Sequence, residues 1–165
     1  MKTLILALLA LTLVAAKPSL AITGTWSGLL HGENGTDTVT YKFSAQGNPI
    51  LGFATRSGWQ EVEVREVGQT KEWLLPGRGW GRARIEALNV TADRVQVVFS
   101  LYRESGGGSL IDQSRRRLGL DFAQTGATLQ TTLVVESTNH SSGNGVGLYA
   151  GSRGRQSIQG VLRRN

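Results

Sequence analysis

The sequence predicts an all-β protein, an antiparallel up-and-down meander of about 8–10 strands. Apolar and polar residues alternate in several segments, most clearly in 38–44 and 94–101, and a period of two is typical of strands with one buried face. Turn-forming groups rich in glycine, asparagine and aspartate separate these segments. Because the connections are too short for crossover helices, we expect an antiparallel meander that is closed as a barrel or folded as a sandwich.

The expected strands follow one another along residues 22–165. They lie near 22–31, 37–45, 50–56, 59–67, 70–75, 80–90, 93–104, 114–124, 127–137 and 156–164. Within them, alternation collects large apolar side chains on one face and polar ones on the other. The inward positions of a barrel built this way include Val39, Tyr41, Phe43, Val97, Phe99, Leu120, Phe122, Leu133 and Val135.

Residues 1–21 have the three-part pattern of a cleaved secretory signal. Lys2 precedes an apolar block that is short for a membrane span, and the small residues Ser19 and Ala21 stand before the expected cleavage point. We expect a secreted or periplasmic protein that begins at Ile22, forms one domain over 22–165 and has no membrane span after cleavage. An uncleaved signal anchor is the alternative.

Composition limits the chemistry and the partners. The chain has no cysteine, so disulfides, thiol chemistry and cysteine-based metal sites are excluded. Loss of Lys2 and Lys17 with the signal would lower the formal charge from +6 to +4. The arginines are scattered along the chain, whereas a nucleic-acid surface needs them clustered, so we expect no nucleic-acid partner.

No motif indicates catalysis. His31 and Glu33 pair a base with an acid, but they stand at a turn with no nucleophile near them in the sequence. The sequence contains neither a Gly-x-Ser-x-Gly elbow nor a phosphate-binding GxxxxGK[ST] loop. We expect no enzyme, no cofactor and no metal site, although two carboxylates brought together by the fold could still form a glycosidase pair.

Three features could serve a protein partner instead. The segment 105–109 is a glycine-rich hairpin tip, and a longer Gly/Ser-rich connection occupies 139–155. Such connections act as binding loops or as passive linkers. Trp80, Arg82 and Arg84 form an alternating aromatic and basic stripe, opposite Ala83, Ile85 and Ala87, that could meet an acidic or sugar-bearing partner.

The segment Ile22-Thr23-Gly24-Thr25-Trp26 resembles the Gly-x-Trp opening of the lipocalin-like (calycin) β-barrels. The resemblance favours a closed barrel over a sandwich, and it implies that Trp26 closes the barrel floor and that a basic residue near the end of the last strand packs across it. Parity favours Arg164 over Arg163 for that role, and a guanidinium over an indole face is an attractive cation–π contact. The Thr-Asp-x-x-Tyr signature and the disulfide of that family have no counterpart here.

These observations favour a small exported binding protein that holds an apolar or amphipathic ligand inside the barrel. We expect Tyr41, Phe43, Phe99, Arg116 and Phe122 to contact the ligand. Tyr41 and Arg116 are the expected polar contacts, because each stands by parity among apolar neighbours; a place at the barrel rim is the alternative for Arg116. The alternative functions are a protein-binding module, as in an exported inhibitor or adhesion domain, and a small outer-membrane barrel.

Overall fold

The computed structural model describes residues 22–33, 35–75, 79–104, 110–137 and 155–165, and every regular element in them is a strand. The signal, the tip at 105–109 and nearly all of the 139–155 connection therefore lie outside the described residues. The ten strands are β1 (Gly24–Gly32), β2 (Gly35–Phe43), β3 (Pro49–Thr55), β4 (Gly58–Glu63), β5 (Thr70–Leu75), β6 (Gly79–Val90), β7 (Arg94–Glu104), β8 (Leu110–Thr125), β9 (Thr128–Ser137) and β10 (Arg155–Arg164).

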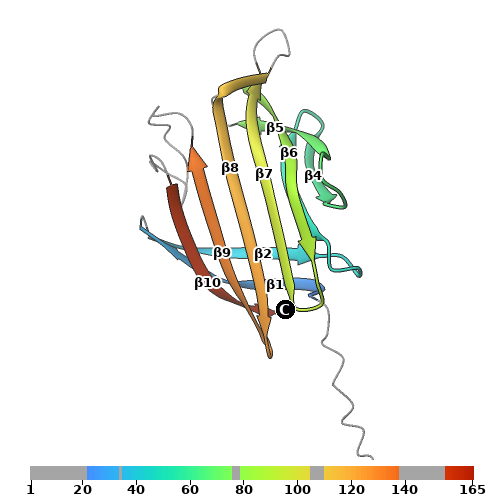
Figure 1. The fold of residues 1–165 in the computed structure, drawn as a ribbon, viewed down its shortest axis with the longest axis vertical. Coiled ribbons are helices and arrows are strands. Elements are labelled where there is room, and N and C mark those ends of the chain that lie inside the picture. The colour runs from blue at the N-terminus through green and yellow to red at the C-terminus, as the bar shows by residue number, and fades with distance from the viewer. Residues whose placement is uncertain (1–21, 34, 76–78, 105–109, 138–154) are drawn as a thin grey trace, which may run out of the picture.

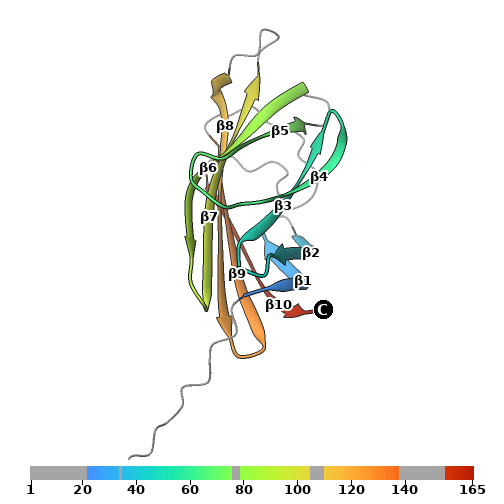
Figure 2. The same cartoon turned by 90° about the vertical axis from the view of Figure 1, so that its right-hand side faces the viewer.

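The strands form one antiparallel sheet in the order β4-β3-β2-β1-β10-β9-β8-β7-β6-β5. Strands that are neighbours in sequence pair with each other, except β4 and β5, which form the two edges of the sheet. In addition, β1 pairs with β10. The up-and-down meander is thus confirmed. The sheet curls into a half-barrel, with β6 to β9 on one side and β1 to β4 on the other (Figures 1 and 2).

Alternation places the core on the concave face. Many concave side chains of β1, β7, β8, β9 and β10 are almost fully buried; they include Leu30, Val95, Val97, Phe122, Leu129, Leu133, Ile158 and Leu162. Their cross-strand partners lie on the same face, so they form rows across the sheet, such as Val97, Leu120, Leu133 and Ile158. The side chains between these inward positions along each strand are mostly polar and face outward.

Two strands differ from the expected pattern. The strand expected at 59–67 ends at Glu63, because the side chain of Gln69 accepts a hydrogen bond from the backbone N–H of Arg65 (2.9 Å) and donates one to the carbonyl of Glu63 (2.9 Å). These bonds stabilise a turn in place of a ladder. In β6, a bulge between Ile85 and Ala87 turns Ala87 outward and exposes it. Ala87 therefore does not share a face with Ile85.

Candidate ligand-binding interior

One end of the concave face is closed by Trp26, which is 1% exposed. Its indole N–H donates to the carbonyl oxygen of Thr23 at 2.9 Å. Arg164 is the register partner of Trp26 and places its guanidinium carbon 5.0 Å from the ring centroid, while its Nη2 donates to the same carbonyl at 3.2 Å. The expected choice of Arg164 over Arg163 is confirmed. We call this end of the interior the Trp26 end.

A turn from the opposite side of the sheet completes the Trp26 end. Gly47, in the turn between β2 and β3, has φ +84 and packs against the carbonyl of Ile22 and the side chain of Val90. The left-handed conformation favours glycine, and a side chain there would lie 3.3 Å and 3.4 Å from these two neighbours. The end of β6 and the β2–β3 turn therefore meet beneath the core.

Three of the five expected contact residues come together above this end. The ring of Tyr41 packs against that of Phe122 with 4.9 Å between the centroids and an interplanar angle of 71°. The ring of Phe43 also packs against Phe122, at 5.0 Å and 88°. Both are edge-to-face geometries, which are favourable for aromatic pairs. Phe43 and Phe122 are buried and Tyr41 is half-buried. The cluster joins β2 to β8 across the interior.

The other two expected residues lie in rows farther from Trp26. Phe99, 8% exposed, is paired with Ile85 and Leu118. Arg116 is half-buried, one row beyond, paired with Leu101. The concave face therefore changes from aromatic and aliphatic near Trp26 to cationic near Arg116.

Gln156 is a concave residue that the sequence reasoning missed. It begins the inward series of β10, is paired with Val135, and is 2% exposed. Among the residues that the structure describes, neither its Oε1 nor its Nε2 has a hydrogen-bond partner. Counting back by two from Ile158 along the alternating strand reaches Gln156, so parity was the available signal. We call this part of the interior the Gln156 end.

The backbone of β1 makes room for this amide. Gly32, at the end of β1, has no side chain, and a Cβ there would lie 3.5 Å from Gln156 Nε2 and 3.1 Å from Ile158 Cγ1. The amide therefore occupies the space above Gly32. Thr131, 2% exposed and opposite Phe122, is a second buried polar side chain whose Oγ1 has no partner.

In the described residues no ladder joins β3 or β4 to β5, and we call the line between these strands the seam. On one side are β3 and β4, and on the other are β5 and β6; β3 lies beside β5. Inside the seam, Phe53, Val62 and Val64 face Ala83 and Ile85 around a cavity of about 10 Å³, which is about the size of one water molecule. Next to it is an open groove of about 400 Å³ that shares Thr70 and Lys71 with the cavity.

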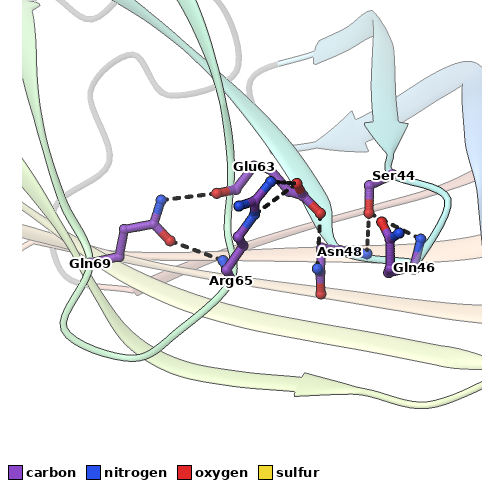
Figure 3. A network of polar contacts seen from close by, with 6 residues as sticks. All are labelled: Ser44, Gln46, Asn48, Glu63, Arg65 and Gln69. Carbon is purple, nitrogen blue, oxygen red and sulfur yellow. Dashed lines mark hydrogen bonds and ion pairs between the residues drawn. The ribbon is translucent and has the colours of Figure 1, made fainter.

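A polar cluster holds the seam near the Trp26 end (Figure 3). Asn48 Nδ2 donates to Glu63 Oε1 at 3.0 Å, and Arg65 donates to Glu63 Oε2 at 2.9 Å and 2.7 Å. Hydrogen bonds from Asn48 and Ser44, followed by Arg65, lower the pKa of Glu63 to about 2. Beyond it, the backbone of Gly68 and Gln69 hydrogen-bonds to Ile85.

The convex face carries a second acidic cluster. Glu86, at the bulge of β6, accepts hydrogen bonds from Ser100 (2.5 Å) and Tyr102 (3.3 Å) and from Arg117 (3.2 Å). Ser100 is fully buried, so this arrangement offers no accessible nucleophile. On the same face, the hydrogen bond from Arg94 lowers the pKa of Asp121.

The remaining expected features are placed as follows. Arg82 and Arg84 are exposed on β6, whereas the side chain of Trp80 lies outside the described part. In that part, no three histidine, cysteine, aspartate or glutamate side chains gather where they could hold a metal ion. The described residues also include no helix long and apolar enough to cross a membrane.

No protein-family model matches the sequence. Comparison with curated proteins and with solved structures found no significant similarity. The arrangement of Trp26 and Arg164 agrees with what the lipocalin resemblance implies for those two residues, and the kinship itself stays a prediction.

Proposed function

We propose that the protein is an exported carrier that binds a small amphipathic ligand in its concave interior. The observation that carries the proposal is Gln156, whose amide is buried with both polar atoms unpartnered in the described part of the chain. A buried polar group without a hydrogen bond costs about 1–3 kcal/mol. A ligand with a group that both donates and accepts, such as a carboxylic acid, an amide or an alcohol, would satisfy this amide.

The graded interior supports an amphipathic ligand over a purely apolar one. The rows near Phe122 present mostly hydrocarbon and aromatic surface to a ligand tail, with Thr131 as a polar member, whereas Gln156 and Arg116 bring polar groups to the other end. Arg116 suits a polar or anionic group because its guanidinium stays charged. Tyr41 and the rings of Phe43, Phe99 and Phe122 are the proposed contacts of the tail.

The proposal includes closure of the half-barrel around the ligand. Nine of the ten strand-to-strand junctions of a closed ten-stranded barrel are hydrogen-bonded ladders, and β4 with β5 is the tenth. Enclosure on all sides is typical of small-molecule sites, which bury most of the ligand surface. The seam is therefore the place where ligand binding would complete the barrel.

Native mass spectrometry on protein purified from its own host tests the proposal. We expect the wild type to retain a small molecule and to bind 1-anilinonaphthalene-8-sulfonate saturably, and Gln156→Leu to lose the retained molecule. Gln159→Leu is the matched control, because Gln159 lies on the same strand but on the convex face. It should behave as the wild type.

Stability gives a second readout on the same variants. Removal of the unpartnered amide should raise the free energy of unfolding of ligand-free Gln156→Leu by about 1 kcal/mol in urea melts. The carrier function is contradicted if the protein retains no molecule and binds no dye saturably, and if Gln156→Leu, Arg116→Leu and Tyr41→Phe alter neither result. A protein-binding module would then be the better account.

A further inference from the structure

We infer that ligand reaches the interior sideways, through the seam between the β3–β4 hairpin and β5, by release of one latch that joins Arg56 to Glu72. This inference rests on the proposed function, since an access route matters only for a protein that binds inside. It is carried by the hydrogen bonds and voids along the seam, which are independent of Gln156.

The seam lacks the hydrogen-bond ladder present between every other pair of adjacent strands. β1 and β10, for example, share six registered residue pairs, from Trp26–Arg164 to His31–Gln159. In the described residues, no register joins β3 or β4 to β5. Separation of two laddered strands leaves a row of backbone groups unpaired, whereas separation along the seam does not. The sheet is therefore easiest to open here.

The two ends of the seam are held differently. Near Trp26, the Glu63 cluster ties the β2–β3 turn to the segment that pairs with β6 (Figure 3). At the far end, the β3–β4 turn contacts β5 through Arg56, whose backbone N–H donates to Glu72 Oε1 at 3.2 Å and whose Nε lies 3.7 Å from Glu72 Oε2. The first cluster is a hinge, and the second contact is a latch.

The latch is weak because its two side chains are exposed to solvent. The side chains of Arg56 and Glu72 are 57% and 37% exposed, and exposed ion pairs are strongly screened by water and salt. The hinge combines several hydrogen bonds with a carboxylate whose pKa is lowered to about 2, so Glu63 remains charged and bonded at ordinary pH. Opening is therefore directed to the latch end.

The surfaces on either side of the latch suit the passage of an amphipathic molecule. The open groove is polar and is lined by Thr55, Ser57 and Gln60 on the hairpin side and by Thr70, Lys71 and Glu72 on the β5 side. The neighbouring small cavity is lined by Phe53, Val62, Val64 and Ile85, and Thr70 and Lys71 line both spaces. A molecule that crosses here leaves a polar surface and meets an apolar one.

The test uses the absence of cysteine from the chain. In Arg56→Cys/Glu72→Cys, the two introduced thiols can be bridged selectively with dibromobimane after folding. We expect the bridge to slow both association and dissociation of 1-anilinonaphthalene-8-sulfonate at least tenfold in stopped-flow measurements. The dissociation constant should stay the same, because a closed seam hinders passage in both directions without altering the bound state.

Removal of the latch should do the opposite. Glu72→Ala should accelerate both rate constants, and Glu136→Ala is the matched control. Glu136 makes similarly long ion pairs with Arg117 and Arg155 and is 39% exposed, but it lies on β9, away from the seam. This control should leave both rates unchanged.

The outcomes separate the two proposals. Saturable dye binding with rates that neither the bridge nor Glu72→Ala changes overturns the seam route and leaves the interior site standing. Absence of saturable binding in the wild type overturns the interior site, and the access route with it. Equal changes in Glu72→Ala and Glu136→Ala indicate a general effect of surface charge and also overturn the latch.

Discussion

At the scale of single residues, the interior combines tightly packed aromatic side chains with one amide that has no partner. Trp26 satisfies its only donor through Thr23 and lies beneath Arg164, so it is both buried and fully bonded. Gln156 is equally buried and satisfies neither of its polar atoms. Folded proteins rarely keep such a group without a reason, and this contrast with Trp26 supports the ligand contact proposed for Gln156.

Trp26→Ala should lower the free energy of unfolding by about 3–5 kcal/mol, the range for emptying a large buried aromatic site. Trp59→Ala is the matched control, because Trp59 is 69% exposed on the edge strand β4 and surface substitutions usually change stability by less than about 0.5 kcal/mol. Urea melts measure both values. Similar losses in the two variants would contradict a closing role for Trp26.

At the scale of elements, the β3–β4 hairpin is held to the rest of the sheet by a short ladder to β2 and by side-chain contacts. Glu63 is the main acid in this attachment, and its partners Asn48 and Arg65 come from the turns on either side of β3 and β4. The pairing of β2 with β3 is confined to the registered pairs Lys42–Ile50 and Phe43–Pro49. The hairpin therefore depends on ionised Glu63.

This dependence predicts acid sensitivity. The pKa of Glu63 is lowered from 4.5 to about 2 in the folded protein, so its stabilising contribution is present above the unfolded value and is lost as the pH falls from about 4.5 through about 2. The lowered pKa of Asp121 acts in the same direction. Urea melts between pH 6 and pH 2 should show a shallower loss of stability in Glu63→Gln than in the wild type. Parallel pH profiles would contradict this role.

The bulge in β6 is the element that alternation could not anticipate. One extra residue at Glu86 moves Ala87 to the convex side and directs the Glu86 carboxylate to Ser100, Tyr102 and Arg117. A bulge arises where cross-strand partners make the extra residue favourable, and those partners lie on β7 and β8. The sequence of β6 alone contains no sign of them.

At the scale of the whole molecule, the first and the last described strands lie next to each other in the sheet. β1 pairs with β10, so the break in the sheet falls between β4 and β5 in the middle of the sequence. A meander with free terminal strands would expose two edges formed by the chain ends; here the edges belong to two short strands of six residues each. Short edge strands limit unwanted pairing with other chains.

The predicted export is testable on the same molecule. Protein from its own host should have the mass of a chain that begins at Ile22, because Ser19 and Ala21 stand where signal cleavage favours small residues. Intact-mass measurement distinguishes this product from the full chain of 165 residues. A product that still carries Lys2 would contradict cleavage and, with it, the exported carrier.

Local pattern was sufficient for the strands, their order and much of the concave face. Strict alternation identified Phe43, Phe99 and Phe122 as inward residues, and parity selected Arg164 as the partner of Trp26. These features depend on the period of two in a single strand and on short turns, both of which can be read along the chain. The meeting of Tyr41 and Phe43 with Phe122 followed only once β2 and β8 faced each other across the curl.

The unpartnered state of Gln156, the seam and its latch had no local signal. Whether a buried amide finds a partner depends on every strand packed around it, and Gln156 lies between Val135 of β9 and the bare backbone of Gly32. The Arg56–Glu72 contact likewise depends on how far the sheet curls, which is set by the accumulated twist of ten strands. The strand pattern is determined by neighbouring residues in the sequence. The curl of the sheet and the hydrogen-bond partners of a buried polar group depend on all strands together, so only the folded molecule decides them.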